Sequence, residues 1–340
     1  MIFIPYYFFF LGVMFLGRVI SLSSSRWFYI WIGLEINLLS FIPVIICGSN
    51  DIESEGAVKY FLVQALGSCI ILLGYFSFLR MRFLGTDFIS VIPRYITFFS
   101  LIIKIGIFPF HHWLPQVIRR VRWFTCLLLS VLQKLAPSLI LCFIVFSFSS
   151  SFLLLLGSIG SLFGGLIGIN QSQLRVLLAY SSIGHLGWML SSICLSFFVF
   201  FSYYLIYSFI RIGIIFLLSI YPVKLVNLRR FGRIPNFFIL LLGLRFLSLA
   251  GLPPFLGFYS KLIVLICIVG ANKFLFAAIL IIGSLINLFY YLGIFFNLYI
   301  VSLIRGFSLN FKAFKSYYLI VLSFFIRLSY FGFGLFYIFC

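Results

Sequence analysis

Residues Leu101–Pro115 read LIIKIGIFPFHHWLP, so Lys104 and Pro109 lie within one apolar run. A charge at the centre of a bilayer costs at least about 2.5–3.5 kcal/mol on insertion scales. Proline removes a backbone N–H and clashes with the carbonyl group four residues earlier. The stretch therefore predicts a helix that is broken at mid-membrane, next to a charged side chain.

The rest of the chain is similarly apolar. Of its 340 residues, 64% are hydrophobic and only 9% are charged, which is too few to cover a soluble domain of this length. Apolar runs of about 20 residues, long enough to cross a bilayer as a helix, recur along the chain. They lack the alternation that is typical of a transmembrane β-strand. The sequence therefore predicts an all-α, polytopic transmembrane helix bundle surrounded by membrane lipid.

Charge and cysteine placement exclude other classes. The net charge of +19 does not indicate nucleic-acid binding, because the basic residues are scattered singly between apolar runs. The seven cysteines include no C-x-x-C pair and are expected to be buried apolar residues. Since the first charge is Arg18, no cleavable leader or transit peptide is expected.

Breaks at Ser, Gly, Pro and charged residues predict about 11 spans within a single transmembrane domain, 1–340. The spans are 2–22, 26–46, 56–80, 94–117, 122–147, 150–170, 173–193, 196–221, 236–270, 273–303 and 316–338. Asp51, Glu53, Glu55 and Asp87 are expected in loops. The loops on the side of the N-terminus hold more lysine and arginine than those on the opposite side, which predicts the N-terminus inside and the C-terminus outside.

One motif occurs twice. GIFPF at 106–110 recurs as GLPPF at 251–255, an offset of 145 residues, and each copy lies in an apolar run that also holds a lysine. Pro109 in the first copy and Pro253 and Pro254 in the second are expected to break their helices.

These copies fall in the fourth and ninth predicted spans, which cross the membrane in opposite directions. The pattern predicts two inverted-topology five-helix repeats, roughly 1–147 and 150–303, each with a broken helix, followed by a C-terminal helix at 316–338. Proline kinks that serve helix packing alone are the alternative.

Titratable side chains lie inside several spans: Glu35, Lys104, Lys134, His185 and Lys261. Pro137 follows Lys134 by three residues, so a helix break is also expected there. Three lysines and one glutamate cannot all be neutralised in pairs. A row of coupled groups can pass protons, because the protonation of one shifts that of its neighbours.

Structural roles are the alternatives for these groups. One Glu–Lys pair could simply hold two helices together, and His185 could be a hydrogen-bonded packing residue. Arg211 and Arg245 are expected nearer the helix ends, as snorkelling side chains or helix contacts. Redox chemistry is not expected, because no cysteine cluster could hold an iron–sulfur centre and three histidines, two of them adjacent, cannot supply two pairs of haem ligands. No phosphate-binding glycine motif is present.

Six segments from about Trp27 to Lys261 read, in order, GLEINLLSFIP, KYFLVQALGS, PFHHWLPQV, QKLAPS, NQSQLRVLLAYSSIGHLGWML and LSLAGLPPFLGFYSKL. Together they resemble the mitochondrial NADH dehydrogenase (ubiquinone) subunit 2 family, the antiporter-like, proton-pumping subunits of respiratory complex I. The resemblance implies that Glu35 pairs with Lys104, that Lys134 is the connecting central lysine and that Lys261 faces the exit path. It places His185 between the last two.

The resemblance also implies a setting. The chain is expected to carry no cofactor, with NADH, FMN, iron–sulfur clusters and ubiquinone on other subunits, and its expected partners are the other membrane-arm subunits. The expected location is the mitochondrial inner membrane, with the N-terminus on the matrix side and the C-terminus on the intermembrane side.

The sequence departs from the family pattern at a few positions. They are His112 and Gln116 in the segment PFHHWLPQV, Val176 after Arg175, and Ser260 and Leu262 on either side of Lys261. None of them removes a mid-membrane charge, but they bear on the local shape around Lys261.

These features predict a proton-translocating subunit of NADH:ubiquinone oxidoreductase that relays protons through the mid-membrane row of Glu, Lys and His. The alternative is a stand-alone cation/proton antiporter, since broken helices in inverted repeats also serve that class. A purely structural scaffold is the third hypothesis, under which the buried lysines could be replaced by methionine without effect.

Overall fold

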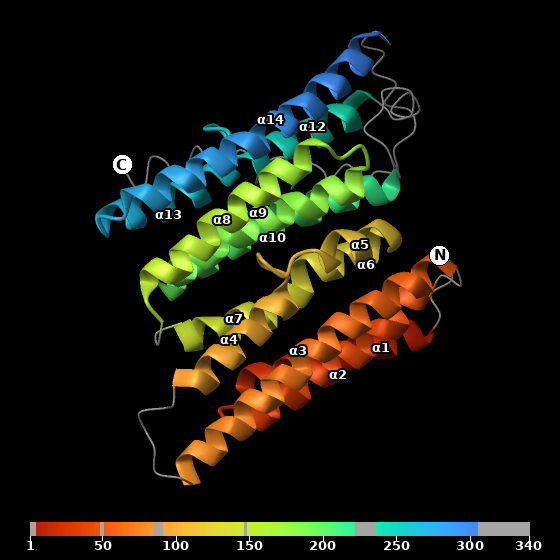
Figure 1. Ribbon diagram of the computed structural model, residues 1–340. Coiled ribbons are helices and arrows are strands. Elements are labelled where there is room, and N and C mark those ends of the chain that lie inside the picture. Colours follow the sequence, from red (N-terminus) through yellow and green to blue (C-terminus); the bar gives the residue numbers. More distant parts are fainter. Residues whose placement is uncertain (1–4, 48–50, 84–90, 146–147, 222–235, 305–340) are drawn as a thin grey trace. The chain divides into compact units, whose positions relative to one another are not determined.

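The computed structural model describes residues 5–47, 51–83, 91–145, 148–221 and 236–304. The chain forms two compact units, Met1–Ser149 and Ser150–Cys340 (Figure 1). The described residues are helical with short connections, which confirms the all-α prediction. The predicted helix 316–338 and Asp87 lie outside the described residues.

The first unit contains three long helices followed by shorter pieces. They are α1 (Pro5–Ser23), α2 (Trp27–Ile46), α3 (Asp51–Phe83), α4 (Val91–Ile105), α5 (Trp113–Arg120), α6 (Trp123–Leu127), a π-helical turn (Leu128–Leu132) and α7 (Gln133–Val145). Helix α2 packs against both α1 and α3, and α4 packs against α3 and α7 (Figure 1).

The second unit consists of α8 (Ser150–Ile169), α9 (Leu174–Ile193), α10 (Phe197–Ile220), α12 (Asn236–Ala250), α13 (Leu256–Gly270) and α14 (Phe274–Ile304). Helix α9 is the most central helix of this unit. Of the residues in its apolar 18-residue stretch, 94% are buried, whereas the corresponding share for α14 is 33%. Helix α8 packs on α9 at glycines, where a Cβ on Gly187 would lie 2.4 Å from the Gly157 carbonyl oxygen. Small residues allow this close approach of two membrane helices.

Eight helices of the described residues are long and apolar enough to cross a membrane: α1, α2, α3, α6 with α7, α8, α9, α10 and α14. The fourth and ninth predicted spans, 94–117 and 236–270, are instead two helices each. In both, a non-helical segment separates the two halves, at residues 106–112 and 251–255.

The third span begins earlier than expected. Helix α3 starts at Asp51, so Asp51, Glu53 and Glu55 belong to its first two turns and not to a loop. Carboxylates at this end of a helix are favoured by the positive end of its dipole. The predicted span began only at residue 56, after these carboxylates, because charged residues were treated as loop signals.

Candidate functional site

The break in the first unit contains Pro109 and begins with a glycine cap. Gly106 adopts φ +79°, a left-handed conformation that is strained for other residues. The N–H groups of Gly106 and Ile107 both donate to the Ile102 carbonyl, at 2.9 and 3.2 Å. These are the hydrogen bonds of a glycine-capped helix terminus, so α4 ends here and is not merely kinked.

The break in the second unit, which contains Pro253 and Pro254, is built in the same way. Gly251 adopts φ +83°, and the N–H groups of Gly251 and Leu252 donate to the Leu247 carbonyl at 3.2 and 3.5 Å. Ile102 and Leu247 are separated by the same 145 residues as the two motifs. The similarity therefore extends from the sequence to the backbone geometry of the cap.

Lys104 is the penultimate residue of α4 and is 5% exposed. Gly67 on α3 leaves room for it, because a Cβ there would lie 2.8 Å from Lys104 Cγ. Two side chains donate hydrogen bonds to the carbonyls at the end of the helix. Gln64 Nε2 donates to the Lys104 carbonyl at 3.0 Å, and Trp113 Nε1 donates to the Ile103 carbonyl at 3.1 Å. The break is thus stabilised from α3 and α5.

Lys104 and Lys134 line the same small cavity, of about 20 Å³. Its other polar walls are Asn37, Tyr60, Gln64 and Gln133. A cavity of more than about 10–15 Å³ with several polar partners can hold a water molecule. The structure therefore brings two of the predicted lysines to one hydratable space, although they lie 30 residues apart in the chain.

The amides in this wall were not predicted from the sequence. Asn37 Nδ2 donates to Gln133 Oε1 at 2.6 Å, and Gln133 Nε2 lies 3.3 Å from Met14 Sδ. The bond joins α2 to the start of α7, directly before Lys134. Asparagine and glutamine inside apolar spans were the available signal, because an unpaired amide is costly in a membrane.

Glu35 lies on α2, next to Leu34 of the cavity wall. Its charge acts on Lys104, but no ion pair between described residues joins the two. One Glu35 carboxylate oxygen is buried without a hydrogen-bond partner among the described residues. The direct pair implied by the resemblance is therefore not formed in this arrangement.

The predicted break at Pro137 is wrong. Pro137 lies inside α7, which continues to Val145. The irregularity is instead the π-helical turn Leu128–Leu132, which directly precedes Gln133 and Lys134. Single wider turns of this kind occur inside α-helices, frequently at functional sites.

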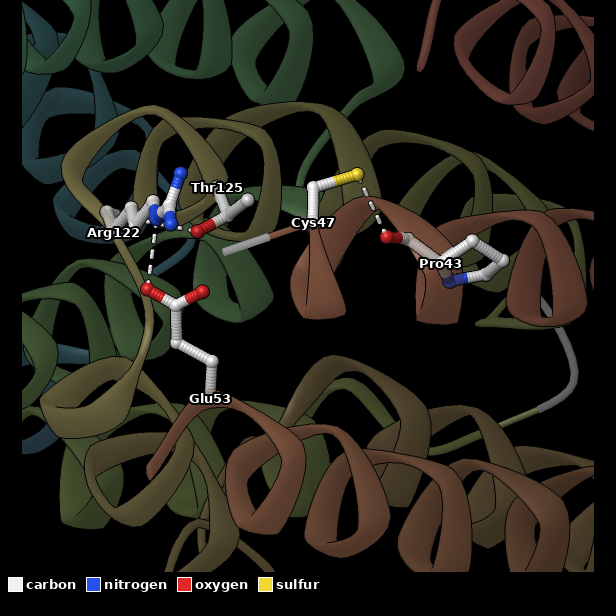
Figure 2. Close-up of polar contacts among 5 residues, drawn as sticks. All are labelled: Pro43, Cys47, Glu53, Arg122 and Thr125. Atoms are coloured by element: carbon white, nitrogen blue, oxygen red, sulfur yellow. Dashed lines mark hydrogen bonds and ion pairs between the residues drawn. The ribbon is translucent and has the colours of Figure 1, made fainter. Parts of the chain in front are cut away.

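Ion pairs fix the short helices that follow the first break. Arg122 Nε donates to Glu53 Oε1 at 2.8 Å, and Thr125 Oγ1 donates to the Arg122 carbonyl at 2.9 Å (Figure 2). Arg120 Nη2 lies 2.7 Å from Glu55 Oε1. Because Glu53 is 6% exposed and Glu55 54%, the Glu53 carboxylate is the better shielded from water, while its partner Arg122 is 51% exposed.

Lys261, in the second unit, lies after its break on α13 and reaches back across it. Its Nζ donates to the Ala250 carbonyl at 2.7 Å. That carbonyl is at the C-terminal end of α12, where the helix dipole favours a cation. A Cβ on Gly251 would lie 3.0 Å from this Nζ, so the glycine also makes room for the lysine. The neighbouring Ser260 hydroxyl, at one of the departures from the family pattern, donates to the Gly257 carbonyl.

His185 lies on the central helix α9, and its Nδ1 is 2.8 Å from the hydroxyl oxygen of Tyr203 on α10. The Tyr203 ring stacks on Trp188, with an interplanar angle of 5°. Trp188 in turn lies 5.9 Å, ring centroid to Nζ, from Lys261. Tyr203 and Trp188 thus connect the two predicted groups. The sequence held no signal for Tyr203, because tyrosine and phenylalanine fill this span.

Arg211 is not a snorkelling residue near a helix end, because it is 0% exposed. Its Nη2 donates to the Leu178 carbonyl at 2.6 Å and its Nη1 to Ser181 Oγ at 3.3 Å. Arg245, which is 5% exposed, lies 5.4 Å above the Phe209 ring. Because residues 150–340 contain no Asp or Glu, carbonyls, hydroxyls and rings solvate these cations in place of carboxylates.

The predicted row is therefore distributed over two units. Glu35, Lys104 and Lys134 belong to the first, and His185 and Lys261 belong to the second. In the first unit Lys104 and Lys134 line one cavity, and in the second unit the rings of Tyr203 and Trp188 lie between His185 and Lys261.

Comparison with known proteins agrees with the arrangement. Residues 24–287 match the family "NADH:quinone oxidoreductase/Mrp antiporter". The chain is 38% identical to NADH-ubiquinone oxidoreductase chain 2 of Lumbricus terrestris over 291 residues, covering 84% of each chain. It is 35% identical to the chain 2 protein of Locusta migratoria, covering 85% of this chain and 84% of that one.

Two solved structures share the fold. A chain of respiratory complex I from Thermus thermophilus matches with a TM-score of 0.81 and 22% identity, over 96% of this chain and 77% of that one. A chain of the Mrp complex from Dietzia sp. matches with a TM-score of 0.76 and 19% identity, over 85% and 59%. The fold is thus that of the antiporter-like subunits, and the sequence matches narrow the family further. The chain belongs to the NADH-ubiquinone oxidoreductase chain 2 family, the antiporter-like membrane subunits of complex I.

Proposed function

We propose that this subunit translocates protons by relaying them through Glu35, Lys104, Lys134, His185 and Lys261, without a redox centre of its own. The observation that carries the proposal is the cavity shared by Lys104 and Lys134. Two lysines buried around one hydratable space have no evident packing function, since apolar residues of similar size would fill the space at lower cost.

Transfer in the first unit starts at Glu35 and Lys104. A carboxylate near an ammonium group favours the charged form, and withdrawal of the carboxylate favours release of the proton. The proton leaves Lys104 Nζ, which becomes a neutral amine, and passes through a water molecule in the cavity to neutral Lys134, which becomes the ammonium. The separated Glu35 and Lys104 of this structure correspond to the releasing arrangement.

In the second unit the proton is received at His185 and passes onward to Lys261. The Tyr203 hydroxyl bonds to Nδ1 of His185 and so fixes the orientation of the ring that receives the proton. Lys261 then releases it to the exit path. Its bond to the Ala250 carbonyl supports the charged form until release.

The two units are proposed to be inverted repeats in one membrane domain of 11 spans. The supporting observations are the matching glycine caps and the fourth helix of each unit, which is broken in both. We place the chain in the mitochondrial inner membrane, with the N-terminus on the matrix side, among the other membrane-arm subunits. NADH, FMN, iron–sulfur clusters and ubiquinone are assigned to those other subunits of the complex.

The test replaces Lys134 with methionine in the assembled enzyme reconstituted in vesicles. We expect NADH-driven proton uptake to fall by at least about tenfold, as for the loss of a general acid–base group, while the complex still assembles. Lys59→Met is the matched control, because Lys59 is 36% exposed and lies outside the cavity. Unchanged pumping in Lys134→Met would overturn the proposal.

The antiporter alternative draws on the same family, whose description includes Mrp antiporters. It predicts that the full chain alone, in liposomes, exchanges sodium for protons. We expect no such exchange without the other subunits, because the proposed driving event is a change delivered by a neighbour. Sodium-dependent proton movement by the isolated chain would favour the alternative.

A further inference from the structure

A second cavity lies in the first unit, away from the lysines. It is a cleft of about 480 Å³ whose wall includes Trp27, Tyr75, Phe78, Arg94 and Phe143. None of its lining residues also lines the cavity of Lys104 and Lys134. The proposed proton relay leaves this cleft without a role.

The cleft lies where four helices begin or end. Trp27 is the first residue of α2, Arg94 is near the start of α4, and Phe143 is near the end of α7. The α3 residues Tyr75 and Phe78 belong to the last three turns of that helix. These four helix ends are not at a glycine-capped break, so we place them at the bilayer surface and the cleft at the level of the lipid headgroups. Tryptophan and tyrosine are enriched at this level.

The described wall of the cleft is positively charged. Among the residues that the structure describes, Arg94 is exposed and is the one charged residue that lines it. Arg80 on α3 is also exposed at this end of the unit. A basic pocket between membrane helices is suited to the phosphate of an anionic lipid.

The remaining walls are apolar. Phe143 is 72% exposed and Phe78 is half-buried, while Pro93 and Ile144 form a buried floor. The Thr97 hydroxyl donates to the Arg94 carbonyl at 2.9 Å, so it is already occupied by the helix. One exposed guanidinium above an apolar, aromatic wall matches a phosphate joined to an acyl chain. A protein partner would instead require an interface of about 1,000 Å² or more.

We propose that this cleft binds one anionic glycerophospholipid, with its phosphate on the Arg94 guanidinium and an acyl chain along Phe78 and Phe143. Trp27 and Tyr75 flank the headgroup. The site requires only that the chain spans a membrane, so it stands independently of the proton relay.

The first experiment measures lipid binding to the purified full-length chain by native mass spectrometry. Phosphatidylglycerol and phosphatidylcholine with identical acyl chains are the two probes. We expect preferential retention of phosphatidylglycerol, and Arg94→Gln should weaken it by about fivefold, as for one basic residue at a lipid surface. Arg94→Lys should bind nearly as well as wild type, which distinguishes lost charge from a misfolded chain.

Arg26→Gln is the matched control, because Arg26 lies at the same end of the unit but does not line the cleft. It should leave binding unchanged. Equal retention of the two lipids, unchanged binding in Arg94→Gln, or an equal loss in Arg26→Gln would each overturn the proposal.

The second experiment uses the assembled complex in its native membrane, with a phosphatidylglycerol that carries a photoreactive diazirine in its acyl chain. We expect labelled peptides that contain Tyr75–Phe78 and Phe143. Cross-linking of the same peptides to another subunit, without lipid labelling, would show that a protein covers the cleft and would overturn the assignment.

Discussion

Tyr203 and Gln64 show how single buried side chains set up the titratable groups. Tyr203 is the hydrogen-bond partner of His185 at 2.8 Å, and Gln64 donates to the carbonyl of Lys104. Neither the Tyr203 hydroxyl nor the Gln64 amide needs to carry the proton itself. In a low-dielectric interior an unpaired polar group is expensive, so these partners decide which orientation the histidine and the helix end adopt.

Tyr203→Phe should reduce NADH-driven proton uptake by about tenfold, because His185 loses a buried hydrogen-bond partner that is worth about 1–1.5 kcal/mol or more. Proton uptake by reconstituted vesicles is the measurement. Tyr29→Phe provides a control, since Tyr29 is 49% exposed. If uptake is the same in both variants, Tyr203 has no part in the relay.

Gln64→Leu should destabilise the subunit by about 1–3 kcal/mol, because the Lys104 carbonyl would be left buried without a donor. The midpoint of thermal unfolding of the purified complex is the measurement. Gln171→Leu should change it much less, since Gln171 is only half-buried and donates to the Ile167 carbonyl of its own helix end. A loss as large in the control would indicate a general effect of glutamine replacement.

At the scale of elements, the two broken helices end in the same glycine cap, but their lysines lie on opposite sides of the break. Each break begins with a left-handed glycine whose N–H returns to the helix it ends. Lys104 precedes its break, whereas Lys261 follows its own and bonds to the carbonyl end of α12. The shared cap exposes backbone groups at depth, which is tolerated only where protein or water satisfies them.

Gly106→Ala and Gly251→Ala should each destabilise by about 1–2 kcal/mol, because an alanine is strained at φ near +80°. Gly251→Ala should also disturb Lys261, since the new methyl group would lie 3.0 Å from its Nζ. Unfolding midpoints in detergent measure the first effect and proton uptake measures the second.

Gly12→Ala is the control for both, because a Cβ there meets nothing within 4 Å. It should leave stability unchanged or slightly raised, as expected for alanine in a helix. Equal behaviour of all three variants would contradict the assignment of the two glycines as caps.

At the scale of the whole molecule, the charges are divided unevenly. All five acidic residues precede residue 90, and the second unit holds buried arginines and a lysine without any carboxylate. The buried cations of this unit are therefore stabilised by carbonyls, a hydroxyl and an aromatic ring in place of carboxylates.

Assembly gives the prediction at this scale. In a native gel run in mild detergent, the chain should migrate with NADH-oxidising activity and not as a free subunit. An antibody to the chain and an activity stain of the same lane are the measurements. Migration of most of the chain apart from that activity would contradict its role as a subunit driven by neighbours.

The sequence alone determined the all-α membrane class and the eight long apolar spans of the described residues, and it singled out the titratable groups as candidates. It could do so because apolar length, proline and charge each carry a local cost in a membrane. The same local reasoning explains the errors. Pro137 was predicted to break a helix that in fact continues through it to Val145, and Asp51 was predicted in a loop although it begins α3.

Only the tertiary structure decided which groups meet. The cavity joining Lys104 and Lys134, the separation of Glu35 from Lys104 and the partnership of His185 with Tyr203 depend on how helices pack. Residues distant in the chain meet through side-chain volume and glycine contacts, which leave no local pattern. Lys104 in LIIKIGIFPFHHWLP could be recognised as unusual from the cost of a charge inside a membrane. Which side chains surround it in space is decided by the packing of the helices.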